Sequence, residues 1–147
     1  SRPQSRGYVR ALSSCIKDAP LIQPNYLKET IDQDVLIQGV KICRDLLKTS
    51  NMKKISIKET LPGENVKTDS EILNFVKNNG ATVYHAIGSC RMGIDKDAVV
   101  DADLKLNGVE NLRVADASIM PTMPSGNTNA ATLMIAEKAS DLIKKDK

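Results

Sequence analysis

The sequence predicts a mixed fold of helices and short strands (α/β, or α+β) in which helices are prominent. Two segments, residues 32–48 and 130–144, place apolar side chains at the three- and four-residue spacing of amphipathic helices. Two shorter runs, residues 8–12 and 104–106, alternate in polarity, as short strands do. With 147 residues, 41% of them hydrophobic and 27% charged, the chain has the size and balance of one ordinary globular domain.

The first half of the chain is expected to hold one weak strand, one helix and one loop. The mixed alternation over residues 8–12 favours a short edge or half-buried strand. The following helix, residues 32–48, is expected to begin at a cap supplied by Thr30 or Asp32. Its apolar stripe consists of Val35, Leu36, Val40, Cys43, Leu46 and Leu47. Residues 49–67 are polar and contain the turn-forming pair Pro62-Gly63, so we expect a surface loop.

A second helix is bounded by clearer signals. Thr68 and Glu71 have the spacing of a capping box, in which each side chain accepts from the other residue's backbone N–H. Gly80 is expected to end this helix in a left-handed conformation. Farther on, Asn107-Gly108 lies between apolar runs and predicts a hairpin-like reversal. The residues 124–129 then form a turn rich in Ser, Asn and Thr before the last helix.

Charge and cysteine content exclude several classes of protein. The net charge of +3 comes from 21 basic and 18 acidic residues that are interleaved, so no nucleic-acid partner is indicated. The cysteines at positions 15, 43 and 90 lack C-x-x-C spacing, which argues against a disulfide framework and a metal site. Free thiols are typical of a reducing cytoplasm, where we expect the protein. No run is apolar for the roughly 18 residues that a membrane span needs, although membrane association of a full-length protein stays open.

His85 is the first candidate for chemistry because it is the only histidine, and imidazole moves protons near neutral pH. A lone histidine is more often structural, however. Cys90 is a weaker candidate, as a nucleophile paired with His85. The second candidate is the turn at residues 124–129, whose helix N-terminus and amide side chains favour an anion, although an ordinary helix cap explains it as well.

The glycines supply a negative result. The eight glycines contain no G-x-G pair, so the chain has neither the dinucleotide-binding fingerprint nor a phosphate-binding P-loop. The main phosphate site of any nucleotide cofactor is therefore expected outside these 147 residues. The sequence also starts without Met, which is compatible with a fragment.

Several sequence blocks, in their order, resemble the C-terminal signature of the glucose–methanol–choline (GMC) family of flavin-dependent oxidoreductases, of the choline-dehydrogenase-like kind. The blocks are His85–Gly93, Ala98–Asp101, Leu112–Pro121, Ser125–Ala130 and Met134–Ala139. The likeness extends to Ser5–Gly7 and Pro20–Leu27, and it is weakest across residues 49–67. The resemblance covers nearly the whole chain but only the last quarter of a family member.

The resemblance implies a composite fold. Residues 1–110 would belong to the antiparallel-sheet domain that binds substrate, and residues 111–147 would supply the last strand, Leu112–Ala115, and the last helix of the FAD-binding domain. The rest of that domain would be the missing N-terminal part of the same polypeptide. FAD is the implied cofactor, and a small alcohol is the implied substrate.

The resemblance also assigns roles to residues. His85 and Asn127 would be the catalytic pair, since the family has a histidine at the first position and a histidine or asparagine at the second. Asp116 and Ala117 would lie near the ribityl–pyrophosphate part of FAD. The tripeptide Asn127-Thr128-Asn129 would lie near its isoalloxazine ring. Two alternatives stay open: a flavin-containing hydroxynitrile-lyase-type enzyme, and a module without catalysis.

Overall fold

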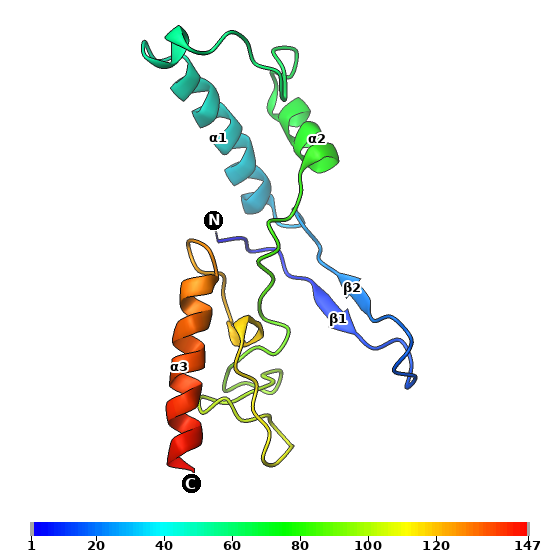
Figure 1. Ribbon diagram of the computed structural model, residues 1–147. Coiled ribbons are helices and arrows are strands. Elements are labelled where there is room, and N and C mark those ends of the chain that lie inside the picture. Colours follow the sequence, from blue (N-terminus) through cyan, green and yellow to red (C-terminus); the bar gives the residue numbers. More distant parts are fainter. Residues whose placement is uncertain (1, 147) are drawn as a thin grey trace. The chain divides into compact units, whose positions relative to one another are not determined.

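The computed structural model describes residues 2–146, and it combines helices with one small sheet. The elements, in order, are β1 (Tyr8–Arg10), β2 (Leu21–Gln23), α1 (Thr30–Leu47), the 3-10 helix η1 (Met52–Lys54), α2 (Asp69–Asn79), the 3-10 helix η2 (Ala117–Ile119) and α3 (Asn129–Lys145) (Figure 1). Strands β1 and β2 pair in a two-stranded antiparallel sheet. The predicted mixed fold class is confirmed.

The chain divides into two compact units. One is built mainly from residues Ile22–Thr82 and contains α1 and α2; the other is built from Tyr8–Leu21 and the segment from Val83 onward, and contains α3. The division between these units does not coincide with the boundary after residue 110 that the resemblance implies. That boundary concerns the domains of a longer protein and stays a prediction.

Helices α1 and α2 pack against each other through a small apolar contact. Ile37 of α1 and Ile72 of α2 are buried. The apolar stripe of α1 that the spacing identifies is not the buried face. Val35 and Leu46 of this stripe are 56% and 59% exposed. Apolar residues occur around much of α1, so their periodicity predicts a helix but does not settle which face is buried.

The ends of α2 show one confirmed prediction and one wrong one. Thr68 Oγ1 accepts from the Glu71 backbone N–H at 3.3 Å, and Glu71 Oε2 accepts from the Thr68 N–H at 2.8 Å, which completes the capping box. Gly80 has a φ of −68°, so it is not left-handed. Its hydrogen side chain is needed for another reason, because a Cβ there would lie 2.6 Å from the carbonyl oxygen of Val76.

The predicted caps of α1 are wrong. Glu29 is the N-cap residue and makes no capping hydrogen bond, while Thr30 is already helical. The Asp32 carboxylate accepts instead from the backbone N–H groups of Gln4 and Ser5, at 2.8 and 2.7 Å. Burial raises the pKa of Asp32, but these hydrogen bonds outweigh burial and leave the pKa below its ordinary value. The Asp32 side chain is therefore bonded to a distant segment and does not cap its own helix.

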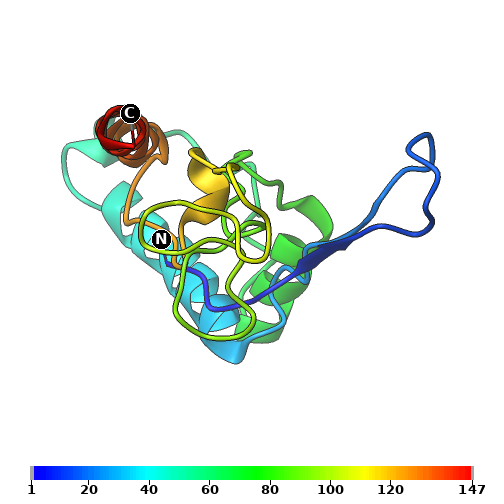
Figure 2. The same ribbon diagram turned by 90° about the horizontal axis from the view of Figure 1, so that it is seen from below.

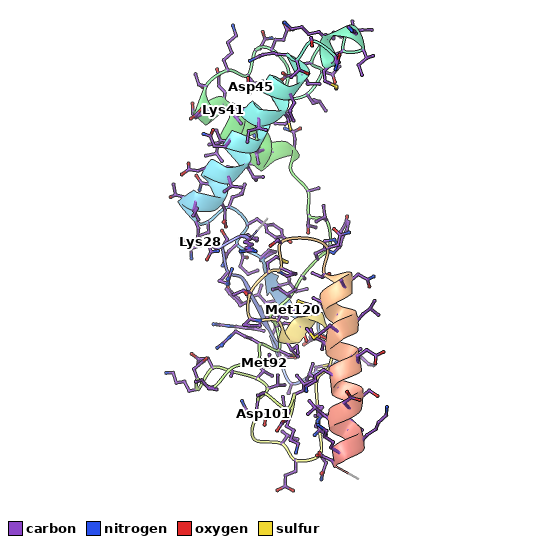
Figure 3. The ribbon with its side chains drawn as sticks, turned by 90° about the vertical axis from the view of Figure 1, so that its left-hand side faces the viewer. Lys28, Lys41, Asp45, Met92, Asp101 and Met120 are labelled. Carbon is purple, nitrogen blue, oxygen red and sulfur yellow. The ribbon has the colours of Figure 1, made fainter. Side chains whose placement is uncertain are left out.

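The second unit has its core between α3 and the segments before it. The buried residues are Val100, Leu104, Ile119, Met120, Ile135 and Ala139. Figure 2 shows α3 end-on, with η2 and the loops of residues 84–115 beside it. In Figure 3 the side chains of Met92 and Met120 lie close to each other beside α3. This core holds the loops that carry the candidate site.

The reversal at Asn107-Gly108 is confirmed, but the segments on either side of it do not form strands. Leu106 N–H donates to Leu112 O at 2.9 Å, and Val114 N–H donates to Leu104 O at 3.1 Å. Within residues 2–146, the segment 112–115 forms only an isolated bridge, between Lys105 and Arg113, and not the strand that the resemblance implies. A parallel strand needs neighbouring strands on which to form its ladder, and the described residues supply none.

Candidate functional site

His85 lies on the loop that follows α2, and the core of the second unit holds this loop in place. The His85 side chain is half-buried. Two residues later, Ile87 packs against the core, and the Cys90 N–H donates to Ser118 O at 3.0 Å. Gly88 has a φ of +83°, and a Cβ there would lie 3.4 Å from the Met120 carbonyl oxygen. The glycine thus allows the loop to turn closely against the segment of η2.

The residue before His85 has an uncommon backbone. Tyr84 has a φ of 61°, in the left-handed region that costs a residue with a side chain about 1 kcal/mol or more. Such conformations gather at functional sites, where the surrounding structure holds them. Tyr84 therefore marks the approach to His85 as a constrained turn, which the sequence alone does not reveal.

The turn before α3 brings the second candidate segment to the same place. Thr128 is the N-cap residue of α3 and is only 9% exposed. Its Oγ1 atom lies 3.4 Å from His85 Nδ1, across 43 residues of sequence. Ala131, three residues later, packs on the same core as Ile87. The two loops predicted to share a site therefore meet, through Thr128 and His85.

Asn127 and Asn129 flank this contact and are exposed. Asn129 begins α3, a helix of 17 residues without an acidic residue in its first turn and without a capping side chain. The first backbone N–H groups of a helix have no partner inside it and carry partial positive charge. The start of α3 therefore offers donors to an electron-rich group, with amide side chains on both sides.

Asp116 and Ala117 lie at the start of η2. The exposed Asp116 carboxylate accepts from the Ser118 N–H at 2.7 Å and caps this short helix. Hydrogen bonds from Ser118 hold the pKa of Asp116 below its ordinary value. Since the Ser118 carbonyl accepts from Cys90, η2 lies against the loop of His85. All six predicted site residues thus belong to one unit.

One contact at the turn before α3 could not be predicted from the sequence. The guanidinium of Arg2 donates from Nε to Ser125 Oγ at 2.9 Å. The two residues are 123 positions apart, and neither type nor spacing signals the pair. The contact ties the beginning of the chain to the turn that carries Asn127.

A shallow depression of about 420 Å³ lies elsewhere in this unit, and its lining does not include His85 or Asn127. Two of its carboxylates are occupied: Asp95 pairs with Arg91 at 2.7 Å, and Asp101 accepts from backbone N–H groups. Among residues 2–146, no group of three or more His, Cys, Asp or Glu side chains is placed to hold a metal ion. The loops around His85 therefore remain the better candidate.

Comparison with known proteins identifies the family. A family model described as "GMC oxidoreductase" matches residues 3–136. The chain belongs to the GMC oxidoreductase family. The family that the sequence blocks resemble is thereby confirmed.

Individual members of the family are similar over nearly the whole chain. Alcohol dehydrogenase [acceptor] of Pseudomonas putida is 45% identical over 96% of this chain, and the match covers 26% of that protein. Oxygen-dependent choline dehydrogenase of Vibrio vulnificus is 43% identical over 97% of this chain and is also covered over 26%. The structure of a FAD-dependent oxidoreductase from Chaetomium thermophilum matches 99% of this chain and 25% of its own, with 32% identity and a TM-score of 0.90. The chain thus spans about a quarter of each.

No helix among the described residues 2–146 is both long enough and apolar enough to cross a membrane.

Proposed function

We propose that this chain is the C-terminal quarter of a FAD-dependent oxidoreductase that oxidises the CH–OH group of a small alcohol. The observation that carries the proposal is the 3.4 Å contact between His85 Nδ1 and Thr128 Oγ1. The contact brings the only histidine of the chain beside the residue that follows Asn127. The names of the related proteins, alcohol dehydrogenase and choline dehydrogenase, support the same class of reaction.

The residues around the start of α3 fit a flavin. A flavin ring gains negative charge when it is reduced, and the first turn of α3 offers partial positive charge without a competing carboxylate. Asn127 and Asn129 are exposed and supply amide donors for the same ring. The Asp116 carboxylate suits the ribityl hydroxyls, because it accepts hydrogen bonds and would repel a pyrophosphate. Ala117, beside it, leaves room for the cofactor.

The protein side chains would perform the proton chemistry. FAD, when bound, accepts a hydride from the substrate carbon. His85 would accept the hydroxyl proton at a ring nitrogen, which is the role for which imidazole is suited near neutral pH. The Asn127 amide would donate to the substrate oxygen and hold it facing His85. Neither side chain needs a metal ion for these steps.

The partner of this chain in the proposal is the N-terminal part of the same polypeptide. The 147 residues have no G-x-G pair, so the phosphate groups of FAD would be bound mainly by that part. On α3, Leu133 and Met134 are each 61% exposed, and Ile143 is 46% exposed. Such an apolar surface is suited to being covered by further polypeptide.

The substrate class is proposed only as a small alcohol. A quaternary ammonium group such as that of choline is commonly bound by several aromatic rings. The chain has only Tyr8, Tyr26, Phe75 and Tyr84. The related proteins reported above carry oxidoreductase names, which supports oxidation and gives no support to the hydroxynitrile-lyase alternative. A cytoplasmic location is proposed from the free cysteines, which suit a reducing compartment.

The proposal is tested by mixing the full-length protein, purified with its flavin, with a panel of primary alcohols that includes choline, without oxygen. We expect at least one alcohol to abolish the absorbance of the oxidised flavin. Dithionite serves as the control that the flavin is reducible. Reduction by dithionite but by none of the alcohols would contradict the proposal, and release of cyanide from a cyanohydrin would favour the lyase.

A further inference from the structure

Thr128 stands where a threonine normally caps a helix, yet it does not do so. Ser, Thr, Asp and Asn are preferred at the N-cap because their side chains accept from the backbone N–H groups of the first turn. Thr128 is the N-cap residue of α3, but it has helical backbone angles and its side chain makes no capping hydrogen bond. The Thr128 hydroxyl instead contacts His85.

The backbone of Thr128 is held by the first turn of α3, and its side chain is buried. The Thr128 carbonyl oxygen accepts from both the backbone N–H and the Oγ1 of Thr132, each at 2.9 Å. Thr128 is also the one buried polar residue among residues 2–146. A buried hydroxyl needs a hydrogen-bond partner, and His85 Nδ1 is the partner that the structure provides. At 3.4 Å the contact is long, as catalytic hydrogen bonds often are before a ligand binds.

We propose that Thr128 is a positioning residue that holds His85 in one tautomer, with the proton on Nδ1. In a neutral imidazole one ring nitrogen is a donor and the other an acceptor, and the Thr128 hydroxyl can meet Nδ1 in either role. Of the two tautomers, only the one with the proton on Nδ1 leaves Nε2 free to act as a base. With Nδ1–H donating to Thr128 Oγ1, the lone pair of Nε2 is left to accept the hydroxyl proton of the substrate. This inference rests on the proposed function for its purpose, and it assigns Thr128 a role toward His85 in addition to its expected place near the flavin.

The tautomer is measured directly in the full-length protein by nitrogen NMR of ¹⁵N-labelled histidine. The signals of His85 are those that disappear in His85→Gln. We expect wild type to show a protonated Nδ1 and a bare Nε2. Thr128→Val, which keeps the shape and removes the hydroxyl, should move the proton toward Nε2, and Thr128→Ser should keep it on Nδ1. Thr122→Val, in the exposed turn before α3, is the matched control and should leave the signals of His85 unchanged.

Kinetics supply the second measurement. Loss of the group that orients a metal-bound histidine typically costs about 10- to 100-fold in metal affinity or activity, and we expect Thr128→Val to lower kcat by a similar factor. Thr128→Ser should recover most of the loss, which a merely structural role for the methyl group would not explain. The inference is overturned if Thr128→Val leaves the tautomer of His85 as in wild type, or if the Ser variant loses as much as the Val variant. If the full-length protein oxidises no alcohol, the proposed function fails, and the NMR measurement still decides the role of Thr128.

Discussion

Asn127 shows how much of a residue's chemistry comes from its neighbours. By itself it is an exposed amide in a turn, and such residues are common. Its neighbour Thr128 is buried and contacts His85, so Asn127 lies one residue from that contact. The role that we propose for it, orientation of the substrate oxygen, is a hydrogen bond made to a group that gains negative charge.

We predict that Asn127→Ala in the full-length protein lowers kcat/KM for the best alcohol about 10- to 100-fold. A hydrogen bond to a charged group is worth about 1.5–3 kcal/mol, and each 1.4 kcal/mol is a factor of ten. The measurement is steady-state oxidation with the flavin content of each variant determined. Asn65→Ala, an exposed asparagine in the loop before α2, is the control and should have no effect. Equal activity of the two variants would remove Asn127 from the site.

At the scale of elements, a feature could be predicted when its partners lie close in the sequence. Hydrogen bonds between distant segments could not. The capping box of Thr68 and Glu71 was predictable because both partners lie within one turn. The partners of Asp32 were not, because Gln4 and Ser5 lie 28 and 27 residues away in the sequence. For the same reason, the contact between Thr128 and His85 could be expected only from the resemblance, which placed their loops in one site.

The loop between α1 and α2 is fastened by one partly buried ion pair. Arg44 donates from Nη2 and Nε to the Glu59 carboxylate, at 2.7 and 3.0 Å to its two oxygens. Glu59 also accepts from the Gly63 N–H at 3.1 Å, and both charged side chains are less than a fifth exposed. Paired charged hydrogen bonds of this kind are among the stronger ones.

We predict that Glu59→Gln speeds trypsin cleavage at Lys53, Lys54 and Lys58 about tenfold. The loss of about 1–2 kcal/mol makes local opening of the loop more frequent, and cleavage follows opening. Glu64→Gln, an exposed carboxylate in the same loop, should leave the cleavage rate unchanged. The same rate in both variants would show that the ion pair does not hold the loop.

The same pair predicts a dependence on pH. The hydrogen bond and charge of Arg44 hold the pKa of Glu59 below its ordinary value of 4.5. The stabilisation is therefore complete above the ordinary pKa and is lost as the pH falls through the lowered one. Hydrogen exchange of the Gly63 amide, corrected for its intrinsic rate, should be slower in wild type than in Glu59→Gln at pH 6. This difference should disappear as the pH falls through the lowered pKa of Glu59, because the protonated carboxyl group loses its charge.

For the whole molecule, the length of the chain is decisive. It spans about a quarter of the relatives that it matches, and it has no glycine fingerprint for a dinucleotide. The segment 112–115 forms a bridge and no strand, and α3 exposes Leu133 and Met134. In our proposal, the N-terminal part of the same polypeptide pairs with this segment and covers these side chains.

We predict that the purified 147-residue chain binds no FAD tightly. The residues that fit the flavin ring are present, but the main phosphate site is expected in the N-terminal part. Titration with FAD, followed by the quenching of flavin fluorescence, should show no stoichiometric endpoint at micromolar concentrations. The full-length protein is the positive control. Tight stoichiometric binding by the short chain would show that these residues hold the cofactor alone.

The most direct measurement is the rate of flavin reduction by an alcohol in His85→Gln, compared with wild type under single-turnover conditions. A positioned general base contributes about 10²- to 10⁴-fold to the rate. We predict a decrease of that size, with normal flavin content. A rate within a factor of about three of wild type would contradict the assignment of His85 as the base.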